Sequence, residues 1–84
     1  MTPVKIKLYQ RVALTTDIPQ YNLRQGDVAV VAEHLPGTEA SGGEDGYALE
    51  VFNAVGDAIA VVMVPASAVK PLTEQEVLQA RPLA

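Results

Sequence analysis

His34 is the one histidine of the chain and the side chain best suited to acid–base chemistry or metal binding near neutral pH. Either role needs further polar groups that converge on the imidazole, and the sequence shows no partner at a recognisable spacing. His34 falls near the predicted end of a strand, beside a loop. We therefore predict a surface histidine and no metal site.

Three carboxylates, Glu39, Glu44 and Asp45, lie in the loop that follows, together with Ser41-Gly42-Gly43. A calcium loop needs alternating oxygen ligands and a terminal bidentate glutamate, an order that is missing here. The Ser-Gly-Gly run lacks the Gly-Lys-Ser/Thr signature of a phosphate-binding loop. Ser67 lacks a nucleophile-elbow context, and a single histidine gives a hydrolytic triad little support. We predict a solvated acidic loop, no cofactor, no small-molecule substrate and no enzyme activity.

The composition is typical of one small cytoplasmic domain. Its 84 residues are 49% hydrophobic, enough to form a thin core, and the absence of cysteine excludes disulfides and thiolate metal sites. No apolar run approaches the ~20 residues of a membrane helix, and the start lacks the apolar segment of a signal peptide. The net charge is −4, and the basic cluster is limited to Lys5, Lys7 and Arg11. We therefore predict neither a nucleic-acid nor a membrane partner.

Hydrophobic periodicity divides most of the chain into short strands separated by turn residues. The predicted strands are Val4–Leu14, Asp27–Leu35, Tyr47–Phe52, Ala58–Val64 and Val69–Leu72. Gly26 supplies a positive φ before the second strand, and Gly56 closes a hairpin turn after the third. Alternation in the second strand predicts one set of residues in the core and another outside. The predicted core set is Val28, Val30 and Ala32, and the outer set is Ala29, Val31 and Glu33.

The last segment has the form of a helix start. Thr73-Glu74-Gln75-Glu76 matches a capping box, and Pro82 ends the helix that it begins. Short strands with one terminal helix favour a small barrel over a sandwich. We predict a mainly β fold: a small five-stranded SH3-like barrel over residues 1–72, then a short C-terminal helix and tail over residues 73–84.

Four motifs resemble a known family. They are V-A-L-T-T-D-I-P from Val12, L-R-Q-G-D-V from Leu23, a tyrosine-led strand at Tyr47 and V-K-P-L from Val69. As a set over residues 8–72 they resemble the small bacterial domain-of-unknown-function family numbered 4926. Family members tend to have glycine at the position of Asn22 and a Gly-Thr pair in place of Ala29-Val30. The family has no established activity, so the resemblance implies no catalytic residue.

The fourth predicted strand is apolar on both faces, from Ala58 to Val64. One face of a strand in a thin barrel normally meets solvent, so this strand needs a second cover. One interpretation is that Val77 and Leu78 of the terminal helix cover it. The other is an exposed interaction surface made of Val31, Phe52, Ile59, Val61 and Met63.

These patterns predict a non-enzymatic protein–protein interaction module that binds a protein partner or itself, as a homodimer or larger homo-oligomer. An alternative is a small acidic antitoxin or immunity-type partner of a neighbouring gene product, because acidic charge steers a protein toward a basic partner. A third hypothesis is an enzyme or metal-binding protein centred on His34.

Overall fold

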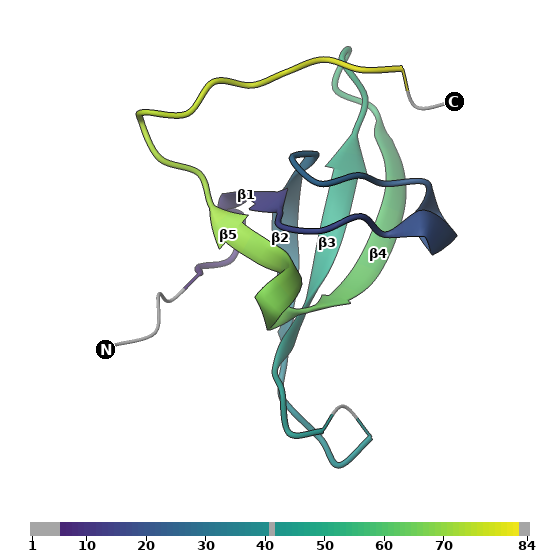
Figure 1. The fold of residues 1–84 in the computed structure, drawn as a ribbon, viewed down its shortest axis with the longest axis vertical. Helices are drawn as coiled ribbons and strands as arrows, with labels where there is room; N and C mark the ends of the chain where they lie inside the picture. The colour runs from purple at the N-terminus through teal and green to yellow at the C-terminus, as the bar shows by residue number, and fades with distance from the viewer. Residues whose placement is uncertain (1–5, 41, 83–84) are drawn as a thin grey trace.

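The computed structural model describes residues 6–40 and 42–82, and its strands form one antiparallel sheet (Figure 1). The strands are β1 (Arg11–Leu14), β2 (Val28–Leu35), β3 (Gly46–Phe52), β4 (Ala58–Pro65) and β5 (Val69–Pro71). Their order across the sheet is β4-β3-β2-β1-β5, so β4 and β5 lie at the two edges. Two 3₁₀ turns, η1 (Pro19–Tyr21) and η2 (Ala66–Ala68), complete the regular structure. The predicted mainly β fold with five strands is confirmed.

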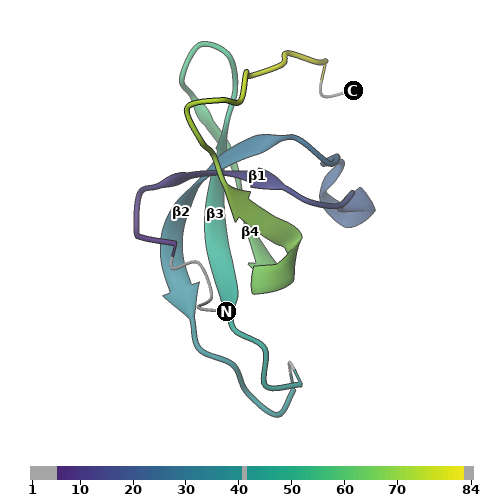
Figure 2. The same cartoon turned by 60° about the vertical axis from the view of Figure 1, so that its left-hand side comes forward.

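The sheet is open, so the predicted closed barrel is wrong. β5 is only three residues long, and all three pair with β1. β5 and β4 are the two edges of the sheet, and the described residues form no ladder between them. Instead, η2 turns the chain from β4 into β5. Figure 2 shows how strongly the sheet twists, since β1 crosses β2 and β3 at a steep angle.

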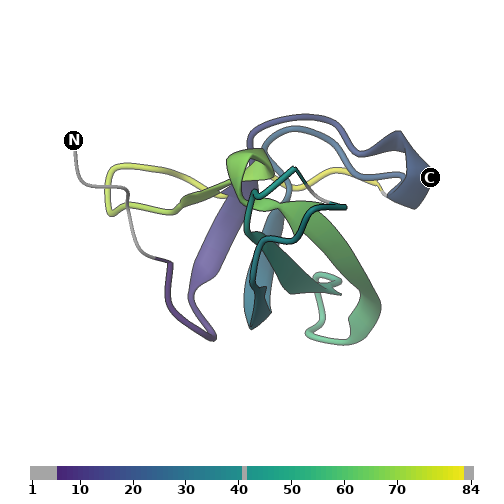
Figure 3. The same cartoon turned by 90° about the horizontal axis from the view of Figure 1, so that it is seen from below.

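The core lies on one side of this twisted sheet. Figure 3 shows the β1–β2 loop and η2 together on that side, and each contributes a buried residue, Leu23 and Ala68. Side chains from all five strands join them. The buried cluster contains Val12, Leu14, Leu23, Ala29, Val31, Tyr47, Leu49, Val51, Val62, Val64, Ala68 and Val69.

The face of β2 that packs against the core is the opposite of the predicted one. Ala29 is buried and Val31 is fully buried at 0% exposure. The first half of β2 is apolar throughout, so alternation gives no preference, and the neighbouring strands decide the orientation. Ala29 pairs with Val12 and Val31 pairs with Leu49, and both partners are core residues. The half-buried residues are those predicted for the core: Val28, Val30 and Ala32.

The first strand is shorter than predicted. Residues 1–5 lie outside the described part of the chain, and a turn interrupts the rest before Arg11. Gln10 N–H donates to the Lys7 carbonyl at 3.2 Å, and Tyr9 has a left-handed φ of 65°. Tyr9 N–H still donates to the Val31 carbonyl at 2.7 Å. The chain therefore follows β2 in this region without forming a regular ladder.

The predicted turns are confirmed at their glycines, and an apolar bridge holds the long β1–β2 loop. Gly26 has φ +91° and Gly56 has φ +89°, both in the left-handed region that favours glycine. Ile18 and Leu23 form a bridge in which Ile18 N–H donates to the Leu23 carbonyl at 2.9 Å. This bridge folds the long β1–β2 loop back onto the core.

The C-terminal segment, residues 73–82, contains no helix, so the predicted helix is wrong. Its first turn does form: Thr73 N–H donates to Glu76 Oε1 at 2.9 Å, and Glu76 N–H donates to the Thr73 carbonyl at 3.1 Å. One turn is costly to nucleate, and the few residues before Pro82 cannot repay that cost. No helix in residues 6–40 and 42–82 is long and apolar enough to cross a membrane.

Candidate protein interface

An exposed apolar strip follows β4 along one face of the sheet. Val61 and Met63 are 62% and 64% exposed, and Ile59 is 43% exposed. Phe52, at the end of β3, is 40% exposed. We call these four residues the apolar β4 face. A group of adjacent, exposed, large apolar side chains is typical of a binding surface, whereas single scattered ones are normal on any protein.

The free edge of β4 lies next to this face. Edge strands present unpaired backbone groups, and most are protected by charged side chains, by proline or by a bulge. β4 has no charged residue, and its proline, Pro65, is the last residue. A bulge is present at the other end: Val51 pairs with Ala60 and Phe52 with Ala58, which leaves Ile59 as the extra residue. The middle of β4 is therefore regular, uncharged and free on one side.

The structure brings together four of the five residues predicted for the interaction surface. Val31 is the exception, because it lies in the core and cannot contact a partner. The alternative interpretation, in which Val77 and Leu78 cover the fourth strand, does not match the exposure of these side chains. Val77 is 83% exposed and Leu78 is 57% exposed, and Val61 and Met63 remain exposed.

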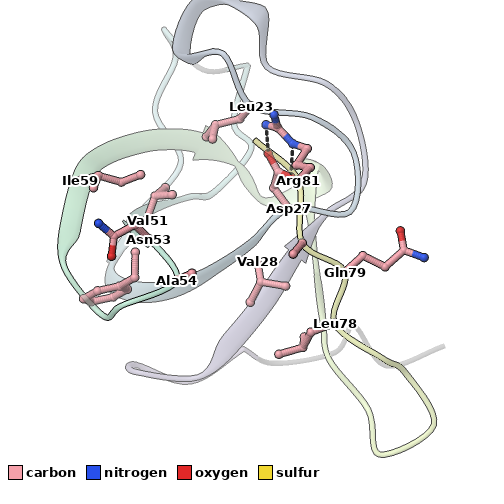
Figure 4. A pocket seen from close by; sticks show the side chains of 12 residues that line it. Leu23, Asp27, Val28, Val51, Asn53, Ala54, Ile59, Leu78, Gln79 and Arg81 are labelled. Carbon is pink, nitrogen blue, oxygen red and sulfur yellow. Dashed lines mark hydrogen bonds and ion pairs between the residues drawn. The ribbon is translucent and has the colours of Figure 1, made fainter. Parts of the chain in front are cut away.

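A cavity of about 630 Å³ adjoins the strip at the β3–β4 hairpin end of the sheet (Figure 4). Phe52 and Ile59 belong to both the cavity and the apolar β4 face. The C-terminal segment closes one side of the cavity through Leu78 and Arg81. In Figure 1 this segment runs across the hairpin end of the molecule, opposite the β2–β3 loop.

Arg81 holds the C-terminal segment to the start of β2. Its Nε donates to Asp27 Oδ1 at 2.8 Å, its Nη2 donates to Asp27 Oδ2, and Nη2 also donates to the Asn22 carbonyl at 3.0 Å. The Arg81 guanidinium, with a smaller contribution from the Arg24 N–H, lowers the pKa of Asp27. Sequence reasoning missed this pair because it assigned Arg81 to a helix and Asp27 only to a strand start.

We expect the Asp27–Arg81 pair to make stability depend on pH. The folded pKa of Asp27 lies below its ordinary value of 3.8, so its contribution is complete above that value and is lost as pH falls toward the folded pKa. Asp27→Asn keeps an acceptor for the Arg24 N–H but removes the charge. Urea unfolding should show the largest wild-type advantage at about pH 7 and a shrinking advantage as pH falls below the ordinary pKa of aspartate. An advantage that is constant with pH would contradict this role.

The acidic loop and His34 form a local structural cluster. Asp45 Oδ1 accepts from Gly37 N–H at 2.7 Å, and Asp45 Oδ2 lies 2.9 Å from His34 Nε2. The Gly37 amide, and after it His34, lower the pKa of Asp45. Glu44 accepts from Ser67 N–H at 2.8 Å, which ties the loop to η2. These carboxylates hold the β2–β3 loop in place.

No group of three or more histidine, aspartate or glutamate side chains suited to a metal occurs in the described part of the chain. His34 is about half exposed, as predicted for a surface histidine, and its ring lies 5.6 Å from that of Tyr47. In the structure, therefore, His34 forms an exposed pair with Asp45 and lies next to the Tyr47 ring.

Fold and surface together describe a small, mainly β protein with an open five-stranded antiparallel sheet and an uncharged edge strand. The chain belongs to the family described as Domain of unknown function (DUF4926), whose model matches residues 8–71. This match confirms the resemblance drawn from the four motifs. No curated protein and no solved structure matches the chain.

Proposed function

We propose that the protein is a non-enzymatic interaction module that self-associates through the apolar β4 face and the free edge of β4. The observation that supports this most is the combination of an uncharged edge strand with exposed Val61 and Met63 on it. Such a strand adds a neighbouring strand by backbone hydrogen bonds, and the adjacent apolar side chains add buried area. A cytoplasmic location, inferred from the composition, belongs to the same proposal.

The acidic antitoxin or immunity-type role is the second candidate, and the net charge of −4 favours it. In this role, a basic partner would contact the acidic β2–β3 loop. There, however, Glu44 and Asp45 accept internal hydrogen bonds from Ser67, Gly37 and His34. Carboxylates engaged in this way are poorer contacts for a basic partner, so we place self-association first.

Light scattering across a range of protein concentrations tests the proposal. We expect the mean mass to rise from one copy toward two between low and high micromolar concentration, since a small interface of this kind gives micromolar affinity. A protein that stays monomeric at high micromolar concentration would refute self-association. Co-purification of a neighbouring gene product with monomeric protein would favour the second candidate instead.

A further inference from the structure

The regular part of β4 is limited on both sides by features of its own sequence. Ile59 is the bulged residue, which interrupts the ladder at the start of the strand. Pro65 has no N–H and ends the strand. Between them, residues 60–64 pair regularly with β3, and this is the length of β4 that can accept a new strand.

A second copy can pair with this segment only in a few ways. A two-fold axis perpendicular to the sheet makes the two β4 strands antiparallel and keeps both apolar β4 faces on the same side. Residues directly opposite each other must then come from the same face of the sheet. Pairing can therefore be centred on Val61, on Val62 or on Met63. It cannot be centred midway between two neighbouring residues.

The bulge at Ile59 and the proline at Pro65 together favour the register centred on Val62. It places Ala60 opposite Val64, and it places the bulged residue of each copy opposite the proline of the other. Centring on Val61 draws the bulge into the ladder opposite Met63. Centring on Met63 draws Pro65 into the ladder opposite Val61. The two limits lie at equal distances from Val62, so only that register uses the whole regular segment.

The side chains of this register are complementary as well. Val61 of each copy lies opposite Met63 of the other, so the two most exposed large apolar side chains of β4 cover each other. No residue of β4 is charged, so a second copy brings no like-charge pair into the ladder. Glu50 of β3 lies directly opposite Val61 on the same face of the sheet, so a partner strand with acidic residues there would bring like charges together.

We propose that two copies join their sheets by antiparallel β4–β4 pairing about a two-fold axis at Val62, with Val61 opposite Met63 of the second copy. This inference rests on the proposed self-association and specifies its geometry. Joining the two edges removes both free β4 edges at once, so association stops at the dimer on this side of the sheet.

Cysteine cross-linking tests the register, because the chain has no cysteine of its own. Opposite Cα atoms in an antiparallel pair are about 4.5–5.5 Å apart, within disulfide range, whereas diagonal neighbours exceed it. We would oxidise Val61→Cys alone, Met63→Cys alone and an equimolar mixture of the two. Val55→Cys, in the exposed β3–β4 turn, controls for collisional cross-linking. Circular dichroism of the reduced variants checks that each one is folded.

The proposal expects a disulfide-linked dimer in the mixture, at least about tenfold faster than in either single variant or the Val55→Cys control. Faster cross-linking of Val61→Cys alone, or of Met63→Cys alone, would show one of the other two registers and overturn this one. Dimers in light scattering without any cross-link above the control would also overturn the register, while self-association would stand. Monomers in light scattering, with no cross-link, would overturn both.

Discussion

Replacing Val31 with aspartate should lower the free energy of unfolding by about 3–5 kcal/mol, because it leaves a carboxylate buried without a partner. Val31 is 0% exposed and pairs with Leu49, another fully buried residue. A domain of this size has a total stability of only about 4–13 kcal/mol, so the loss is a large fraction of it. Burial also raises the pKa of the new carboxyl, so part of the lost stability should return as pH falls and the group becomes neutral.

Val30→Asp is the matched control, since it makes the same change one residue earlier in β2. Val30 is only half-buried, on the face opposite the core, so we expect a loss smaller by at least about 1 kcal/mol. Urea unfolding followed by circular dichroism measures both variants. Equal losses, or a larger loss for Val30→Asp, would contradict the orientation of β2 in the structure and restore the one that alternation predicted.

This pair of variants also shows where sequence reasoning reaches its limit. The bounds of β2, β3 and β4 follow closely from apolar runs and turn residues, and the glycine turns follow from φ preferences. The orientation of β2 does not, because its first half is apolar on both faces. Only pairing with Val12 and Leu49, distant in the sequence, decides which face is buried.

The C-terminal segment was mispredicted for a related reason. A capping box specifies only the first turn of a helix, and that turn is present at Thr73 and Glu76. Whether a helix continues depends on competing contacts. Here Arg81 binds Asp27 and Asn22, residues more than fifty positions away, and the C-terminal segment before it has no helix. No local pattern contains that information.

The candidate interface was largely predictable, and its single error is informative. Ile59, Val61 and Met63 follow from a strand with apolar residues on both faces, which must leave one face uncovered. Alternation places both Phe52 and Val31 outside; Phe52 is exposed, whereas Val31 is buried. The free edge of β4 was not predictable, since it depends on the sheet staying open between β4 and β5, which no local pattern specifies.

Val61→Lys should weaken self-association about a hundredfold while leaving the fold intact. In the dimer each lysine would lie against Met63 of the other copy, and partly desolvating its charge there, even with Glu50 opposite it in β3, costs the equivalent of about tenfold in affinity per site. Two symmetric sites double that free energy. In the monomer Val61 is 62% exposed, and lysine is a normal residue of protected edge strands. We therefore expect the unfolding free energy to change by only about 0.5 kcal/mol.

Val55→Lys is the control that shows whether the position of the added charge matters or only its presence. It makes the same change in net charge, but Val55 is 82% exposed in the β3–β4 turn, away from the regular part of β4. Light scattering should show Val61→Lys as a monomer at concentrations where Val55→Lys and the wild type form dimers. Equal weakening by both variants would mean that net charge, rather than the β4 edge, controls association. Dimers in all three proteins would place the interface elsewhere, because a lysine in the middle of a paired β4 cannot be accommodated without loss of affinity.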